Sequence, residues 1–274
     1  MRSTEQDSRY THLDEMSTLE LLEGMNEEDR RVPEAIGEVI PQIVETVDAI
    51  VERMHNGGRV FYIGAGTSGR LGIVDASEIP PTYGVKDRFI GIIAGGDVAI
   101  RNAVEGAEDD EEQGWKDICM FSPNPTDSVV GIAASGTTPY VVGALRQARA
   151  AGLLTACITS NAGSPVAEIA EHPIVPATGA EFVTGSTRMK AGTATKLVLN
   201  MISTSVMIKS GHVRGNRMVD MELTNVKLVD RGTRMIMAET GLTDYDTARE
   251  MLLEYGHVRE AVDAFRSKQD QNAL

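Results

Sequence analysis

Aromatic side chains are scarce in this chain of 274 residues. They make up 4% of the composition, with a single tryptophan, although apolar residues in total reach 42%. The hydrophobic core must therefore be built from Val, Ile, Leu, Ala and Met. Aliphatic cores of this kind are typical of parallel strands covered by helices. The length allows one large α/β domain or two smaller ones.

Three further absences narrow the class of protein. Positive charge is in deficit, with a formal net charge of -14, so we expect no nucleic-acid partner. Long apolar runs are missing, because residues 1–17 are polar and no stretch reaches the roughly 18 residues of a membrane span. Cysteine is nearly missing, and Cys119 and Cys157 lie in no metal-ligand spacing. These features predict a reduced, cytoplasmic protein without a membrane partner.

Short apolar runs bounded by Gly, Pro, Ser or Asn predict five buried strands, with helical patterns between them. This alternation predicts a doubly wound α/β fold with a five-stranded parallel sheet flanked by helices. From residue 191 onward the pattern is helical, and we expect no further strand. We therefore predict a domain over residues 1–215 that includes an N-terminal helical arm, and a small C-terminal helical appendage over residues 216–274. The predicted strands are 60–63, 89–94, 129–134, 154–159 and 174–175, and the predicted helices are 32–54, 69–76, 139–151, 166–171, 191–209, 218–239, 243–255 and 258–265.

A glycine-rich turn, residues 64–69, follows the first predicted strand and opens a helix. Its spacing fits a dinucleotide-binding fingerprint, but the acidic residue expected about 20 positions later is not in place. The turn instead carries two hydroxyls, on Thr67 and Ser68. Hydroxyls and free amides at a helix N-terminus suit a phosphate group.

A second hydroxyl-rich turn follows the third predicted strand and contains Ser135, Thr137 and Thr138, with Pro139 placed for the first turn of a helix. In an open α/β sheet, ligands bind outside the carboxyl ends of the strands, where two such turns can converge on one anion. Ordinary helix capping by Ser and Thr is the alternative explanation. We predict that the two turns together bind one phosphate group.

A longer segment is more specific. Residues 179–196, GAEFVTGSTRMKAGTATK, resemble the signature shared by N-acetylmuramic acid 6-phosphate etherases and glucokinase regulatory proteins. Both families belong to the sugar isomerase (SIS) superfamily, whose members bind phosphosugars on a five-stranded parallel sheet. The resemblance to the etherases extends over nearly the whole chain and includes residues 75–84, 94–96 and 103–109.

The reaction implied by this resemblance removes D-lactate from C3 of N-acetylmuramic acid 6-phosphate and leaves N-acetylglucosamine 6-phosphate. Elimination followed by addition of water is easier than direct displacement of an unactivated ether, and it needs one acid and one base. Glu78 and Glu108 match the two catalytic positions of the family. We expect Glu78, next to two prolines, to protonate the departing lactate and Glu108 to take the C2 proton. Composition alone does not separate Glu108 from Glu105, Asp109 or Asp110.

The signature segment supplies further candidates. We expect Ser186 and Thr187 to cap a long helix and to act as anion donors near the lactyl or N-acetyl end of the substrate. Arg188 or Lys190 would neutralise the lactyl carboxylate. The alternative is that both cations are structural partners of nearby acids. The five histidines are scattered, so we expect no metal and no cofactor.

The resemblance also predicts a homodimer, with the N-terminal helix and the helix over residues 191–209 as candidate contact surfaces. Three other functions remain to be weighed: a sensor that binds phosphosugars without turnover, an aldose–ketose isomerase, and a nicotinamide-dependent oxidoreductase. The glutamate pair and the length of the chain argue against the sensor. The segments 75–84 and 103–109 argue against the isomerase, and the missing acidic residue argues against the oxidoreductase.

Overall fold

The computed structural model describes residues 3–272, and the side chains of residues 3–269. The chain divides into two compact units. The first contains the residues up to Ser77 together with residues 87–206, and the second contains Glu78–Lys86 and the residues from Met207 onward. We expected a single boundary between residues 215 and 216. The division differs because residues 78–86 and 207–215 group with the C-terminal helices rather than with the sheet.

The first unit is built on a five-stranded parallel sheet with the strand order β2-β1-β3-β4-β5, which confirms the predicted fold class. β1, β3 and β4 are buried at every position, which is why they appear in the sequence as continuous apolar runs rather than alternating ones. The strands are β1 (Val60–Gly64), β2 (Phe89–Ile93), β3 (Ser128–Ile132), β4 (Leu154–Ile158) and β5 (His172–Ile174).

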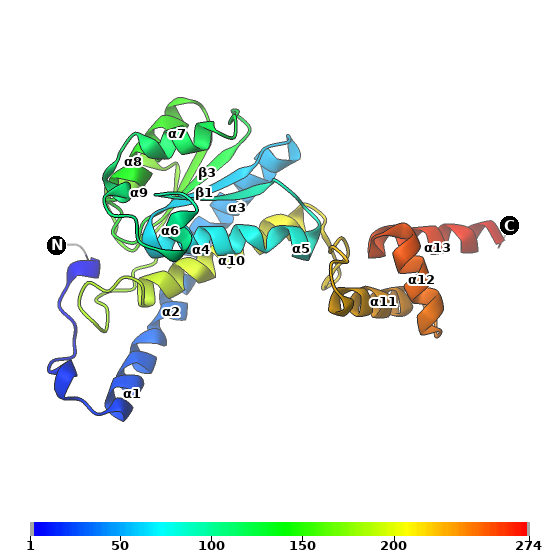
Figure 1. Ribbon diagram of the computed structural model, residues 1–274, viewed down its shortest axis with the longest axis horizontal. Coiled ribbons are helices and arrows are strands. Elements are labelled where there is room, and N and C mark those ends of the chain that lie inside the picture. Colours follow the sequence, from blue (N-terminus) through cyan, green and yellow to red (C-terminus); the bar gives the residue numbers. More distant parts are fainter. Residues whose placement is uncertain (1–2, 273–274) are drawn as a thin grey trace. The chain divides into compact units, whose positions relative to one another are not determined.

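Helices cover both faces of this sheet (Figure 1). One layer contains α3 (Ile40–His55), α4 (Gly66–Ser77) and the first part of α10 (Lys190–Lys209). The other contains α7 (Gln113–Cys119), α8 (Pro139–Ala150) and α9 (Pro165–Ile169). A core of aliphatic residues and Tyr140 lies between the sheet and the second layer. Between β2 and α7 the chain forms α6 (Val98–Arg101) and the short 3-10 helix η3 (Ala107–Asp109).

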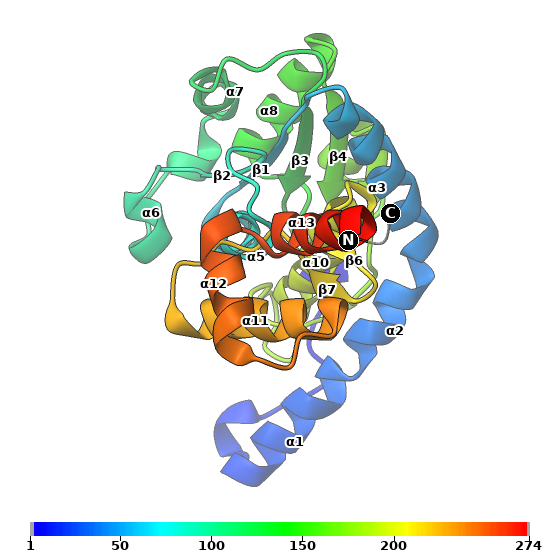
Figure 2. The ribbon, with the colours of Figure 1, turned by 90° about the vertical axis from the view of Figure 1, so that its right-hand side faces the viewer.

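The N-terminal arm differs from the single helix predicted over residues 32–54. It contains α1 (Thr18–Asp29), α2 (Arg31–Glu38) and α3, which follow one another along one side of the first unit (Figure 2). The chain breaks at Val39 because Pro41 would clash with a preceding helical turn, whereas it fits the first turn of a new helix. α1 begins with a capping box between Ser17 and Glu20. Two short 3-10 helices precede it, η1 (Ser3–Glu5) and η2 (Leu13–Glu15).

The second unit has its own small core, formed by residues such as Ile236, Leu252 and Val258. It contains a two-stranded antiparallel hairpin that the sequence did not predict, because strands of two residues carry no periodicity. The helix expected from residue 218 begins later, where the side chain of Asn225 accepts a hydrogen bond from the Leu228 amide. The elements are α5 (Ile79–Tyr83), β6 (Val213–Arg214), β7 (Arg217–Met218), α11 (Val226–Thr240), α12 (Tyr245–Tyr255) and α13 (Val258–Asn272). Within residues 3–272, every helix is too short or too polar to span a bilayer.

Candidate active site

The strand order creates a crevice at one edge of the sheet. β1 and β3 are neighbours, and their last residues lie level, since Gly64 pairs with Ile132. The chain leaves β1 toward β2 on one side and leaves β3 toward β4 on the other. The two connections therefore diverge, and a crevice opens between them at the carboxyl ends of the strands, as in other doubly wound folds.

The first loop of this crevice turns directly from β1 into α4. The helix begins at Gly66, three residues earlier than the sequence suggested, so Thr67 and Ser68 lie in its first turn. The turn is tight enough that a Cβ on Gly64 would lie 2.7 Å from the amide nitrogen of Gly69. Glycine at both positions thus lets the helix N-terminus approach the strand end, where its free amides point into the crevice.

The second loop carries β3 into α8. Gly136 has a φ of +74°, and a Cβ there would clash with the Ser164 side chain. The hydroxyls of Ser135 and Thr137 lie 3.2 Å apart. Thr138 is the N-cap residue of α8, yet its side chain makes no capping hydrogen bond.

One cavity of about 390 Å³ gathers both loops. Among the residues that the structure describes, no hydrogen bond engages the hydroxyls of Thr67, Ser68, Thr138 or Thr187, so capping does not account for them. The cavity brings together six of the predicted binding residues and one predicted catalytic residue: Thr67, Ser68, Ser135, Thr137, Thr138, Thr187 and Glu108.

Glu108 reaches this cavity from η3, next to Gly106, which has a φ of +72°. Of the acids that the sequence left open, Asp109 also lines the cavity, whereas Glu105 and Asp110 do not. Asp110 instead accepts hydrogen bonds from the amides of Glu112 and Gln113 at the start of α7. The geometry therefore reduces the candidates for a base in this segment to Glu108 and Asp109.

The signature segment forms the beginning of α10, but not by the predicted capping. The helix starts at Lys190, and the carboxylate of Glu181 accepts hydrogen bonds from the amides of Lys190 and Ala191, at 2.9 and 3.0 Å. Ser186 and Thr187 therefore do not cap this helix. Glu181 is 1% exposed, and burial raises the pKa of its carboxyl above the ordinary value despite the two amides. An internal carboxylate thus already occupies the N-terminus of α10.

The two cations of the segment differ. Lys190 is 2% exposed, and its ammonium group donates to the carboxylate of Glu28 on α1, which is also buried. Lys190 is therefore a structural partner of an acid, one of the two roles that the sequence left open. Arg188 is exposed and makes no hydrogen bond or ion pair with the described residues. Neither cation lines the cavity, nor does Ser186.

Glu78 belongs to the second unit, where it precedes the first residue of α5. Its side chain is exposed, so the apolar surroundings that Pro80 and Pro81 suggested are not present in the isolated chain. The resemblance alone supports its assignment as the acid. Among the described residues, no group of three or more His, Cys, Asp or Glu side chains is arranged to hold a metal ion.

Sequence reasoning missed one residue of the cavity, Glu5, which reaches it from the N-terminal segment. No local pattern could have found it, because the contact joins residues that are far apart in the sequence.

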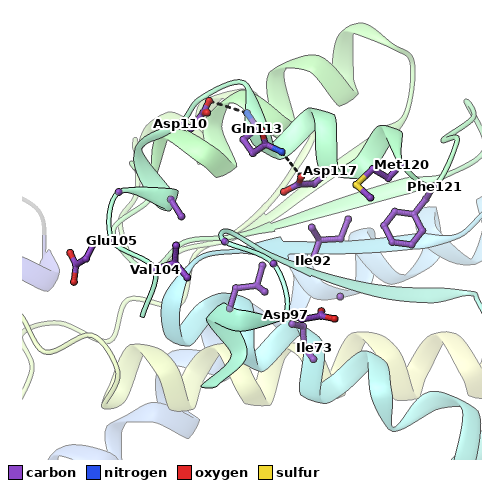
Figure 3. A pocket seen from close by; sticks show the side chains of 16 residues that line it. Ile73, Ile92, Asp97, Val104, Glu105, Asp110, Gln113, Asp117, Met120 and Phe121 are labelled. Carbon is purple, nitrogen blue, oxygen red and sulfur yellow. Dashed lines mark hydrogen bonds between the residues drawn. The ribbon is translucent and has the colours of Figure 1, made fainter. Parts of the chain in front are cut away.

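A second cavity, of about 580 Å³, lies beside the edge strand β2 and is shown in Figure 3. Its lining mixes apolar side chains, such as Ile92, Val104 and Phe121, with several carboxylates, and the Gln113 side chain donates to Asp117 at 2.6 Å. None of the hydroxyl-bearing loop residues lines it. It offers no phosphate site, so the crevice remains the candidate.

Fold and crevice together define the class of protein. Residues 42–149 match the family described as the glucokinase regulatory protein N-terminal SIS domain. A solved phosphoheptose isomerase from Francisella tularensis matches with a TM-score of 0.53 and 18% identity, over 70% of this chain and 100% of that chain. The chain thus shares its fold with this isomerase, and residues 42–149 resemble an SIS domain.

Curated relatives narrow this class. The N-acetylmuramic acid 6-phosphate etherase of Porphyromonas gingivalis (strain ATCC 33277) is 59% identical over 266 residues, which cover 97% of this chain and 97% of that one. The etherase of Bacteroides thetaiotaomicron is 55% identical over 267 residues, covering 97% and 96%. This chain belongs to the N-acetylmuramic acid 6-phosphate etherase family, as its motifs predicted.

Proposed function

We propose that this chain cleaves the D-lactyl ether of N-acetylmuramic acid 6-phosphate and releases D-lactate and N-acetylglucosamine 6-phosphate. Relatives that share 59% of their residues over nearly the full length support this substrate. The observation that carries the proposal is the crevice cavity, in which two hydroxyl-rich loops and Glu108 face the same space.

The hydroxyl-rich loops hold the 6-phosphate. Each of Thr67, Ser68, Ser135, Thr137 and Thr138 can donate a hydrogen bond to a phosphate oxygen, and α4 adds the free amides of its first turn. Among the residues that the structure describes, no lysine or arginine lines the cavity. Amide and hydroxyl dipoles therefore bind the dianion, which is consistent with a chain whose net charge is -14.

Glu108 acts as the base. The sugar opens to its aldehyde, which acidifies the proton on C2. Glu108 takes this proton, the electron pair forms a double bond between C2 and C3, and the bond from C3 to the lactyl oxygen breaks. Water then adds at C3 and a proton returns to C2, so that one ether and one water give one alcohol and one lactate. The bond is broken by elimination, which makes the enzyme a carbon–oxygen lyase.

Glu78 supplies the proton that the departing lactate needs. A lactate alkoxide is a poor leaving group, so a proton delivered to the ether oxygen lowers the barrier. The match to the family's acid position supports this assignment.

Arg188 is the better candidate of the two cations for the lactyl carboxylate. Its guanidinium is free to form a bidentate pair, whereas Lys190 is already engaged by Glu28. Ser186 and Thr187 would contribute hydroxyls at the same end of the substrate, near the lactyl or N-acetyl group.

The proposal includes a homodimer in the cytoplasm that recovers amino sugars from the cell wall. Exposed apolar side chains at helical spacing support the dimer: Leu19 and Leu22 on α1, and Ile40 and Val44 on α3. The free cysteines Cys119 and Cys157 suit a reducing compartment. Light scattering coupled to gel filtration tests the dimer, and Leu19→Lys with Leu22→Lys should yield a monomer.

Release of D-lactate from N-acetylmuramic acid 6-phosphate, followed with a coupled dehydrogenase, tests the function directly. N-acetylmuramic acid without the phosphate is the matched control and should give no turnover. The match to a regulatory SIS domain favours one competing function, a phosphosugar sensor. Binding of the sugar phosphate without any release of lactate would establish the sensor and overturn the etherase proposal.

A further inference from the structure

The N-terminal strap, defined here as residues 3–10, is fastened to the first unit at both ends. At one end Thr4 is fully buried, and its hydroxyl accepts a hydrogen bond of 3.0 Å from the side-chain amide of Asn161, just beyond β4. Ser3 donates to the Asn161 side-chain oxygen, at 3.0 Å. The strap therefore does not lie on this surface as a loose tail.

The other end of the strap is fastened to the signature segment. The Ser8 hydroxyl donates to the backbone oxygen of Phe182 at 2.6 Å, and the Ser8 amide donates to the Thr184 hydroxyl at 2.9 Å. The ring of Tyr10 packs on that of Phe182 with centroids 4.7 Å apart. Because both ends are anchored, the residues between them must cross the rim of the crevice cavity.

Glu5 is the strap residue that enters the cavity. Its carboxylate lies near the signature segment, since a Cβ on Gly185 would be 3.6 Å from the Glu5 Oε2 atom. Among the described residues the carboxylate has no hydrogen-bond donor and no cation as a partner. Glu5 is exposed, so water satisfies its carboxylate until a ligand fills the cavity and displaces that water, and the ligand must then supply a donor itself.

A phosphate cannot be that donor. A carboxylate only accepts hydrogen bonds, and a phosphate dianion carries acceptors and the same charge. Glu5 therefore weakens the binding of a bare phosphate to the hydroxyl-rich loops nearby. It strengthens the binding only of a ligand that brings a hydroxyl group within reach of the same cavity.

We propose that Glu5 is a specificity-determining residue, whose carboxylate accepts a hydrogen bond from a hydroxyl of the bound sugar chain. This inference rests on the proposed function for the identity of the sugar. With the 6-phosphate on the hydroxyl-rich loops and C2 at Glu108, the C4 and C5 hydroxyls lie between them along the substrate. Glu5 selects a polyhydroxylated phosphate over inorganic phosphate and over short phosphate esters.

Paired binding measurements on Glu5→Gln test this selection, with N-acetylglucosamine 6-phosphate and inorganic phosphate as the two probes. Hydrogen bonds to charged groups contribute enough that the Kd for the sugar phosphate should rise about 10- to 100-fold. The Kd for inorganic phosphate should stay the same or fall, because a negative charge has been removed. The KM for N-acetylmuramic acid 6-phosphate should rise with the Kd of the sugar phosphate.

Two matched variants separate recognition from support of the fold. Asp7→Asn removes an exposed carboxylate of the same strap that does not line the cavity, and it should change neither Kd. Thr4→Val removes the buried anchor to Asn161, and a strap that holds Glu5 less firmly should shift both Kd values in the same directions as Glu5→Gln, but by less. If Glu5→Gln weakens both probes equally, or leaves both unchanged, the proposal is overturned.

The two proposals fail in different ways. Wild-type protein that releases no lactate contradicts the etherase function, yet the selectivity of Glu5 can still be read from the two binding constants. Wild-type protein that is active, with a Glu5→Gln variant of unchanged selectivity, contradicts the role of Glu5 alone.

Discussion

The start of α10 and the starts of α4 and α8 look alike in the sequence but differ in the structure. All three follow loops rich in glycine and hydroxyl groups. At α4 and α8 the hydroxyls line a cavity and none of them caps the helix, whereas at α10 the carboxylate of Glu181 already accepts hydrogen bonds from the first amides. A helix N-terminus binds a ligand only where the protein has not supplied its own anion.

The starts of α4 and α8, which are open to a ligand, and the start of α10, which Glu181 closes, also differ in charge. At the starts of α4 and α8 no lysine or arginine of the described residues lines the cavity, while the start of α10 holds Lys190 against Glu28 in the interior. The cation of the signature segment thus fastens α1 to α10. The variants that follow test this division, beginning with the largest expected effect.

Lys190→Met should lower the free energy of unfolding by about 3–5 kcal/mol, because it leaves the buried carboxylate of Glu28 without a cation. Urea denaturation measures the change. The double variant Lys190→Met with Glu28→Leu should recover most of the loss. Arg188→Met is the control, since an exposed cation two positions earlier should matter by less than about 0.5 kcal/mol. Equal effects at the two positions would refute the structural role of Lys190.

Ser135→Ala and Thr67→Val should each weaken the binding of the sugar phosphate by about tenfold or more, because each removes a hydrogen bond to a charged group. Ser186→Ala should leave the Kd for inorganic phosphate unchanged, since Ser186 does not line the cavity. Calorimetric titration with inorganic phosphate measures the Kd of each variant. A larger loss at Ser186 than at Ser135 would mean that the anion binds at the start of α10 instead.

The smallest expected effect on stability is that of substituting Asp75, whose carboxyl also makes the stability depend on pH. Its carboxyl is buried on α4, where it accepts hydrogen bonds from Asn200 at 2.7 Å and Ser203 at 3.2 Å on α10. Burial raises its pKa above the ordinary value, and its second oxygen has no hydrogen-bond partner. A raised folded-state pKa means that stability is fully present below the unfolded value and is lost as the pH rises through the folded value.

Asp75→Asn should therefore stabilise the protein at neutral pH by on the order of 1 kcal/mol, and flatten the fall in stability above the ordinary pKa of an aspartate. Thermal unfolding over a series of pH values measures both. Asp75→Leu is the contrasting variant, and it should destabilise the protein because Asn200 and Ser203 lose their acceptor. An unchanged pH profile in Asp75→Asn would show that another group causes the dependence.

The strands could be predicted well because strands that are buried on both faces appear in the sequence as short apolar runs. All five predicted strands exist, with ends displaced by one or two residues. The helices α2 and α3 were predicted as one helix because the apolar periodicity continues through Pro41, and the hairpin of β6 and β7 was too short to be predicted. The capping box of Ser17 and Glu20 can be recognised in the sequence, and it indicates the start of α1.

The hydroxyl-rich loops could also be predicted, because parallel topology alone brings the ends of β1 and β3 to one edge. The roles of Lys190, Glu181 and Glu5 could not. Glu28 lies 162 positions from Lys190, and Glu5 reaches the cavity only because its strap is anchored at both ends. Such contacts depend on the packing of distant segments, which no local pattern records.

The central claim is that an elimination takes place in the crevice cavity, with Glu108 as the base. Turnover of N-acetylmuramic acid 6-phosphate in heavy water tests this claim most directly. Wild-type protein should release D-lactate and place deuterium at C2 of the product. Glu108→Gln should lower both by about 10²- to 10⁴-fold, whereas Glu105→Gln and Asp109→Asn should retain them. Release of lactate without deuterium at C2, or a Glu108→Gln variant with full activity, would contradict the account.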